Sequence, residues 1–235
     1  MGFCATLAGV AGIRATPSLR REAREGMSKH TPEDEAWLIA RSKRGDLEAF
    51  NQLVERYQQL MYASALRVLG NADAAADVTQ DAFFSAFRHI QSFKGGSSFR
   101  AWLLRIGSNL ACDYWRYKQR HPAASLDELT DDDEPHTQEA LGALVDTHLS
   151  DNPEARLLNQ ELQELIQTGL QQLPLDQRVA VVLCDIEGFS YEEVAASTQS
   201  TLGTVRSRIS RGRTKLRQYL SQHRELLPRD YRLTS

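Results

Sequence analysis

Apolar residues between positions 37 and 69 recur at intervals of three and four, the spacing that gathers them on one side of an α-helix. The pattern predicts one or two helices that end at Gly70, because glycine is the commonest residue just past a helix. Thr31 followed by Pro32 marks a favourable helix start ahead of this segment. The apolar side of the segment consists of Trp37, Leu38, Phe50, Leu53, Val54, Tyr57, Leu60, Met61, Ala65, Leu66 and Leu69.

Two further helices are predicted in the first half of the chain. The first covers residues 73–90 and has an apolar side formed by Val78, Ala82, Phe83, Ala86 and Phe87. Its polar side carries Asp77, Gln80, Asp81 and Arg88. A glycine-rich loop at 92–99 leads into the second, which runs through Tyr117 with an apolar stripe of Leu103, Ile106, Leu110 and Tyr114. No segment shows the alternation of a strand, so the expected fold class is all-α.

The pattern between residues 188 and 220 predicts a helix-turn-helix. Ser190 and Glu193 have the spacing of a capping box, in which a hydroxyl and a carboxylate each satisfy a backbone N–H at a helix start. After a polar interruption at 197–201, helical spacing returns with Val205, Ile209 and Leu216. Two amphipathic segments, at 157–173 and 174–187, are expected to form helices that bury the back of this pair.

Six cations and no acid lie between Ser200 and Arg217. Like charges at this density repel one another, so a polyanion is the natural partner and DNA is the simplest candidate. A recognition helix reads bases with its N-terminal turns, which indicates Arg206, Ser207, Ser210 and Arg211 as base readers. The expected contacts to the DNA backbone, or elsewhere on the surface, are Thr204, Arg208, Arg213 and Lys215. The alternative is a solvated basic face.

Charge is segregated along the 235 residues although the net charge is only −3. Residues 37–120 carry 12 Lys/Arg against 7 Asp/Glu, residues 121–155 carry 10 acids and no Lys or Arg, and residues 188–235 carry 9 bases against 4 acids. The length allows one or two domains. We therefore predict two helical domains, 31–120 and 156–222, joined by a flexible acidic linker at 121–155. The linker could instead lie over a basic groove as a DNA mimic, or run through a channel in a partner.

The two ends of the chain are expected to lie outside these domains. Residues 1–30 are interpreted as a disordered extension and not a signal peptide, because no basic stretch precedes their short apolar run. Met27 is a candidate translation start, and 223–235 is a C-terminal tail. Isolated cysteines at Cys4, Cys112 and Cys184 and scattered histidines indicate no disulfide, metal site or cofactor. We expect a cytoplasmic protein with reduced thiols and no membrane insertion.

Residues 93–120 interleave aromatic rings with cations and an amide. This composition is typical of sites for single-stranded nucleic acid, because bases stack on the rings while Arg and Lys follow the phosphates. Candidates on the helix are Trp102, Arg105, Asn109 and Arg116, and a polar loop beside Asn109 could form a pocket for a flipped base. The alternative is that the rings of Phe93, Phe99, Trp102 and Trp115 belong to the core.

Five motifs in this order resemble a known family, the extracytoplasmic-function (ECF) group of bacterial sigma-70-type RNA polymerase sigma factors. They are DVTQDAF at 77–83, SFRAWL at 98–103, LPLDQR at 173–178, GFSYEEV at 188–194 and GTVRSR at 203–208. The resemblance covers about residues 37–222. It implies a promoter-melting domain, called region 2, and a −35-reading domain, called region 4.

The resemblance also implies partners for particular residues. Asp77, Gln80 and Asp81 would bind the clamp coiled coil of the polymerase β′ subunit, and region 4 would meet the β flap. The loop, with Phe93, Lys94 and Ser97, would capture a base flipped from the −10 element together with Asn109. The linker would occupy the RNA exit path. An anti-sigma factor would hold the protein inactive until a stress signal arrives.

The chain departs from the family pattern at three places, one of which is that residues 1–30 have no family counterpart. Ser197, Thr198 and Gln199 replace the apolar residues and the glycine that are usual in the turn, which is expected to loosen the packing of the helix pair. Thr79 replaces an aliphatic residue in the β′-binding helix. A stand-alone LuxR-type regulator is the alternative function, but it leaves the composition of residues 93–120 unexplained. An enzyme is disfavoured, because no nucleophile–base pairing, phosphate loop or metal spacing occurs in the sequence.

Overall fold

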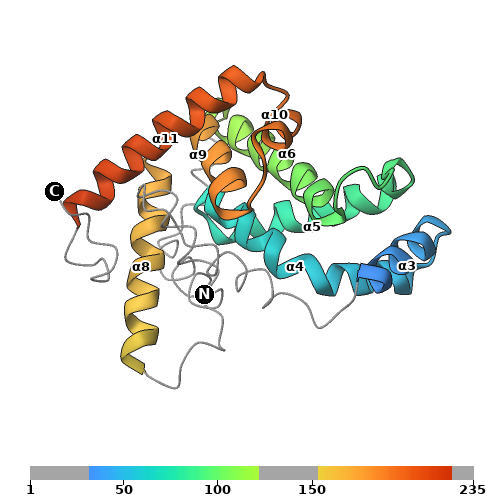
Figure 1. Ribbon diagram of the computed structural model, residues 1–235. Helices are drawn as coiled ribbons and strands as arrows, with labels where there is room; N and C mark the ends of the chain where they lie inside the picture. The colour runs from blue at the N-terminus through green and yellow to red at the C-terminus, as the bar shows by residue number, and fades with distance from the viewer. Residues whose placement is uncertain (1–31, 122–152, 224–235) are drawn as a thin grey trace. The chain divides into compact units, whose positions relative to one another are not determined.

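The computed structural model describes residues 32–121 and 153–223, and these residues form helices and no strand (Figure 1). They divide into two compact units, one containing the helices before residue 121 and the other those after residue 153. The predicted all-α fold with two helical domains is confirmed. The extension at 1–30, nearly all of the acidic linker and the tail after 223 lie outside the described residues.

The first unit consists of α3 (Pro32–Lys43), α4 (Leu47–Leu69), α5 (Ala72–His89), the single turn η1 (Ile90–Ser92) and α6 (Phe99–Arg120). The segment predicted as one or two helices is two, because Gly45 has a φ of +88° and turns the chain between α3 and α4. Asp46 then caps α4, its carboxylate accepting the Ala49 N–H at 3.1 Å. Gly70, with a φ of +76°, ends α4 as predicted.

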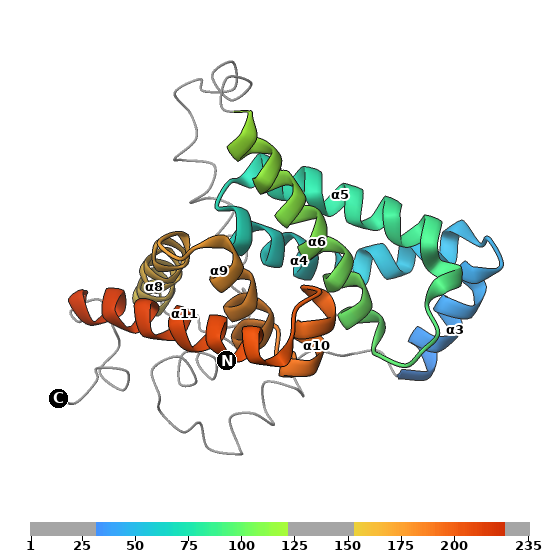
Figure 2. The same cartoon turned by 90° about the horizontal axis from the view of Figure 1, so that it is seen from above.

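Helices α4, α5 and α6 pack against one another around the core of the first unit (Figure 2). Leu53, Leu66 and Leu103 have no exposed surface. At Gly107 of α6, an added Cβ would clash with Sδ of Met61, so a glycine there allows α6 to approach α4 closely. This packing leaves the polar side of α5 and one side of α6 at the surface.

Some of the predicted apolar positions are not core positions. In α6, Ile106, Leu110 and Tyr114 are only half-buried, and the buried side is shifted to Trp102, Leu104 and Ala111. Trp37 is 53% exposed. Its ring lies against the guanidinium of Arg41, 4.5 Å from the ring centroid, so a cation covers a ring that periodicity assigned to the core.

The second unit consists of α8 (Pro153–Gln171), α9 (Leu175–Val181), η3 (Val182–Ile186), α10 (Tyr191–Ser197) and α11 (Leu202–Gln222). α8 begins within the range predicted as linker, which corrects the boundary at 155. Pro153 does not interrupt the helix because it is the first residue, where a backbone N–H would have no helical partner. None of the helices in residues 32–121 and 153–223 is long and apolar enough to cross a membrane.

The helices of the second unit approach α11 at glycines. An added Cβ at Gly212 would lie 2.7 Å from Cγ2 of Val181, and one at Gly169 would lie 2.6 Å from Cδ1 of Leu216. Arg178, which is 5% exposed, donates to the carbonyls of Gln171 and Leu173 at 3.0 and 3.1 Å and so caps the end of α8. Burial lowers the pKa of Arg178 to about 10, so the side chain stays cationic at neutral pH.

Candidate nucleic-acid interface

The short helix α10 begins with the capping box expected from the sequence. The Ser190 hydroxyl accepts the Glu193 N–H at 3.1 Å, and the Glu193 carboxylate accepts the Ser190 N–H at 2.8 Å. Val194 is completely buried beneath α11. A helix of seven residues is too short to be stable alone, so the cap and this contact hold α10 in place.

The turn between α10 and α11 is held by hydrogen bonds, and Ser197 at its start is buried. Gln199 has a φ of +49° and adopts the left-handed backbone that glycine would otherwise supply. The Thr198 hydroxyl donates to the Val194 carbonyl at 2.8 Å, and the Ser200 hydroxyl donates to the Thr198 carbonyl at 3.1 Å. Polar residues hold this turn by hydrogen bonding its backbone, which apolar residues cannot do.

Helix α11 divides its residues between a buried and an exposed side. Thr201 caps the helix by accepting the Thr204 N–H at 3.2 Å. The buried side consists of Val205, Ile209, Gly212, Leu216 and Leu220. On the other side the predicted residues Thr204, Arg206, Ser210 and Arg211 are exposed, and Ser207 is half-buried. The first turns of α11 therefore present cations and hydroxyls to solvent.

Two of the predicted DNA-binding arginines have carboxylate partners within the protein. Arg208 donates from Nε to Asp176 of α9 at 2.9 Å and from Nη1 to the Ser200 hydroxyl at 2.7 Å. Arg213 donates to both oxygens of Asp185, at 2.9 and 2.5 Å, and that aspartate side chain is only 5% exposed. These hydrogen bonds raise the pKa of Arg213 above its usual value. Both guanidinium groups thus join α11 to the preceding helices.

The partner of Arg213 lies in an irregular part of the helix. η3 is a π-helical turn, in which the Glu187 N–H donates to the Val182 carbonyl at 3.0 Å. Asp185 and Cys184 both lie in this turn, and Cys184 Sγ is 3.9 Å from Arg213 Nη2. Burial raises the pKa of Cys184 to about 11, so its thiol is protonated and unreactive at neutral pH.

In the first unit, two of the aromatic candidates belong to the core. Phe93 and Trp102 are each 7% exposed, and their ring centroids are 5.4 Å apart. Phe99, which is 1% exposed, contacts both rings. Phe93 and Trp102 therefore cannot stack against a base in this conformation. Their rings belong to the core, which is the alternative given above for residues 93–120.

The polar candidates of the first unit lie at the surface. Lys94 and Ser97 are exposed in the loop between η1 and α6, where Gly95 has a φ of +76°. Arg105, Asn109 and Arg116 are exposed on α6, and their spacing of four and seven residues places them along one side of the helix. Arg116 is paired with Asp113 at 3.0 Å, and both side chains are well exposed. The polar candidates are thus exposed, whereas the rings of Phe93 and Trp102 are not.

Helix α5 presents a separate surface. Asp77, Gln80 and Asp81 are all exposed on the side opposite Ala75, Ala82 and Ala86, which are fully buried. Phe84 follows on the same exposed side and is 60% exposed. Phe84 is not among the residues predicted from the sequence, although its spacing of three and seven residues from Asp81 and Asp77 places it on the same side of the helix. An exposed ring beside carboxylates and an amide is typical of a protein-binding surface.

Family models match both units. The model for sigma-70 region 2 matches residues 53–121, and the model for sigma-70 region 4 matches residues 163–216. The ECF RNA polymerase sigma-E factor of Escherichia coli K12 is 40% identical over 177 residues, which are 75% of this chain and 88% of the relative. The RNA polymerase sigma-H factor of Pseudomonas aeruginosa PAO1 is 38% identical over 183 residues, which are 78% and 92% of the two chains.

Two solved structures share the fold. One is the sigma factor RpoE in complex with the anti-sigma factor NepR from Bartonella quintana, with a TM-score of 0.53 and 27% identity over 73% of this chain and 96% of that chain. The other is CnrH in complex with the cytosolic domain of CnrY, with a TM-score of 0.54 and 28% identity over 80% and 98% of the chains. The resemblance identified from the five motifs is confirmed, and the chain belongs to the ECF group of sigma-70-type RNA polymerase sigma factors.

Proposed function

We propose that the protein binds core RNA polymerase in the cytoplasm and selects promoters through two separate contacts, one with each unit. The observation that carries the proposal is the exposed side of α11, where Arg206, Ser207, Ser210 and Arg211 project from a capped helix. A helix of this shape fits the major groove, and these side chains can donate to base edges there. Thr204 at the first turn is suited to a backbone phosphate.

Arg206 is the proposed base reader of the −35 element. Replacing it by alanine is expected to cost roughly 1–3 kcal/mol of discrimination at one base pair, if the guanidinium bonds a guanine edge in two places. Binding of holoenzyme to a set of −35 duplexes with single substitutions measures this. An equal loss on every duplex would instead assign Arg206 to a phosphate. We revise the roles of Arg208 and Arg213 to orienting α11, because their guanidinium groups are bound to Asp176 and Asp185.

For the −10 element, we propose that the exposed loop residues Lys94 and Ser97 and the side of α6 with Arg105, Asn109 and Arg116 contact the separated strand. Asn109 can pair with the edge of a flipped base, and the cations can follow its phosphates. Phe93 and Trp102 support this surface from below. The arrangement requires an opened promoter, which fits a protein that acts only with polymerase.

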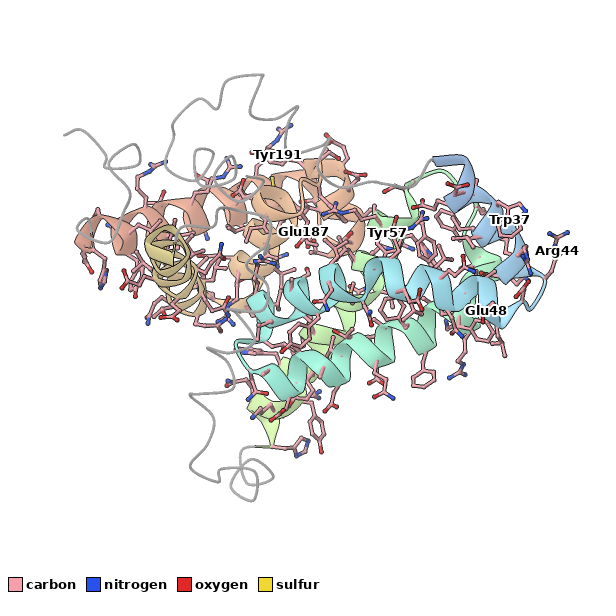
Figure 3. The ribbon with its side chains drawn as sticks, turned by 90° about the horizontal axis from the view of Figure 1, so that it is seen from below. Trp37, Arg44, Glu48, Tyr57, Glu187 and Tyr191 are labelled. Atoms are coloured by element: carbon pink, nitrogen blue, oxygen red, sulfur yellow. The ribbon has the colours of Figure 1, made fainter. Side chains whose placement is uncertain are left out.

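The surface formed by Asp77, Gln80, Asp81 and Phe84 is the proposed contact with the clamp coiled coil of the β′ subunit, and the second unit is proposed to meet the β flap. Asp81→Arg should abolish retention of core polymerase by the tagged protein. Glu48→Arg is the matched control, because Glu48 is an exposed acid on α4 (Figure 3). Undiminished retention by Asp81→Arg would refute the assigned surface, and equal loss in both variants would point to charge alone.

We further propose control by an anti-sigma factor in a stress response, with the acidic linker in the RNA exit path. The support is that two structures of similar fold, RpoE and CnrH, are complexes with NepR and CnrY. Overexpression of the protein followed by transcript profiling should raise a set of genes that share −35 and −10 sequences. The absence of any shared promoter sequence among them would refute a specificity role.

A further inference from the structure

Helix α3 lies outside the residues matched by the region 2 family model, which begin at 53. Its C-terminal end nevertheless touches the start of the loop that we assign to the −10 element. Lys43 Nζ donates to the carbonyl of Phe93 at 2.5 Å, and it lies 5.7 Å from the centroid of the Phe93 ring. The Gln91 side chain donates in the opposite direction, to the carbonyl of Lys43. Two hydrogen bonds therefore join the C-terminal end of α3 to Gln91 and Phe93, just before the loop.

The other end of α3 is joined to the residue that follows the loop. The Tyr57 hydroxyl donates to the carboxylate of Glu35, which is also 3.7 Å from Arg56. The Tyr57 ring packs against Phe99 with centroids 5.5 Å apart. Phe99 is buried, and Ser98 caps α6 immediately before it. Glu35 thus acts on the far end of the loop through Tyr57.

Between these two attachments the loop itself is open. Residues 94–98 are all exposed, and an added Cβ at Gly95 or Gly96 would meet nothing within 4 Å. Such a segment has little packing of its own to define its path, so its position depends on where Phe93 and Phe99 are held.

We infer that α3 is the element that positions the base-contacting loop, with Lys43 as its principal positioning residue. The inference deepens the proposed function and rests on it. Since Lys43 fixes the backbone at Phe93, its ammonium sets the direction in which Lys94 and Ser97 leave the core. A base can then be selected only when the loop is held at one distance from Asn109 on α6.

The test compares Lys43→Met with Arg44→Met in the full-length protein. Methionine keeps an unbranched stem and removes the ammonium, and Arg44 is an exposed cation at the next position, pointing away from the helices (Figure 3). Lys43→Arg restores a charged donor. Tyr57→Phe removes the hydroxyl at the second attachment and keeps the ring, which provides an independent variant if Lys43→Met folds poorly.

The first readout does not depend on promoter recognition. Amide hydrogen exchange at Phe93, whose N–H donates to the Ile90 carbonyl at 3.2 Å, should be about tenfold faster in Lys43→Met, the factor expected when one charge-assisted hydrogen bond is lost. Arg44→Met should exchange like the wild type, and Lys43→Arg should return towards it. Unchanged exchange in both Lys43→Met and Tyr57→Phe would overturn the inference.

The second readout is transcription by holoenzyme from pre-opened promoters that share one −35 element and differ in a single −10 base. Lys43→Met should retain polymerase and lose several-fold in preference for the correct base. A uniform loss on all bases, or an unchanged preference despite a loosened loop, would overturn the inference. If Lys94→Ala and Ser97→Ala leave the wild-type preference intact, it is the assignment of the loop in the proposed function that fails.

Discussion

The ion pair between Arg213 and Asp185 predicts that one arginine of α11 serves stability and its neighbour serves DNA binding. Arg213→Met would leave the Asp185 carboxylate, whose side chain is 5% exposed, without its two guanidinium donors. Removing one partner of a buried pair costs about 3–5 kcal/mol. Because the Arg213 side chain is itself 29% exposed, water moderates the effect and the lower end applies, about 3 kcal/mol.

This loss is large for a unit of fewer than 100 residues. At roughly 4–8 °C for each kcal/mol, the melting temperature of the second unit should fall by about 12–24 °C. The assay is thermal unfolding of the full-length protein followed by circular dichroism, with Arg211→Met as the matched control. Arg211 is exposed on the same helix, so its replacement should leave the melting temperature nearly unchanged.

DNA binding should show the opposite pattern. Below the melting temperature, Arg211→Met should lose roughly 1–3 kcal/mol of discrimination at one −35 base pair, because Arg211 is a proposed base reader. Arg213→Met should keep the wild-type discrimination. The reasoning is refuted if Arg213→Met melts like the wild type and loses discrimination. A double variant, Arg213→Met with Asp185→Leu, should recover part of the lost stability because no unpaired charge remains.

Three further predictions concern the packing of the second unit. Gly212→Ala should destabilise the second unit by about 1–3 kcal/mol in a thermal melt, since the new Cβ would lie 2.7 Å from Val181. Gly203→Ala, on the exposed side of α11, should stabilise the unit by about 0.5–1 kcal/mol in the same melt. Ser190→Ala removes the capping box and should lower the stability of α10 by about 0.5–2 kcal/mol, measured as faster amide hydrogen exchange in α10. Exchange as slow as in the wild type would mean that packing alone holds the helix. Gln199→Gly should relieve a left-handed backbone worth about 1 kcal/mol and raise the melting temperature, and a lower value would show that the Gln199 side chain contributes more than its backbone costs.

The features predicted best from the sequence are local ones. Each of these features depends on residues within one helical turn of each other, so neighbouring residues alone predict it. They are the capping box at Ser190, the end of α4 at Gly70 and the start of α11 after residue 201. The buried side of α11 was likewise predicted, because a single helix resting on a core buries residues at the helical period.

The features that were missed depend on distant parts of the chain. Arg208 meets Asp176 across 32 residues, Arg213 meets Asp185 across 28, and Lys43 meets Phe93 across 50. The residues that flank an arginine in the sequence do not indicate whether a distant carboxylate will form an ion pair with it. In the same way, the buried side of α6 is set by contacts with both α4 and α5, so a single apolar stripe described it only in part.

The π-helical turn of η3 was not foreseen either. A π-helical turn closes its hydrogen bond over one residue more than an α-helical turn, and the apolar pattern on either side is unchanged. Short-range periodicity therefore cannot distinguish the two. Its effect is to place Asp185 where it reaches α11.

The ion pairs that Arg208 and Arg213 of α11 form with Asp176 and Asp185 also indicate which positions of this helix can be changed. Positions 206, 210 and 211 are exposed and position 207 is half-buried, so under the proposed function these four can be randomised together to search for altered promoter preferences. Position 213 should be held constant in such a library, since loss of its pair with the buried Asp185 carboxylate destabilises the unit, whereas position 208, whose partner Asp176 is 48% exposed, contributes less to stability.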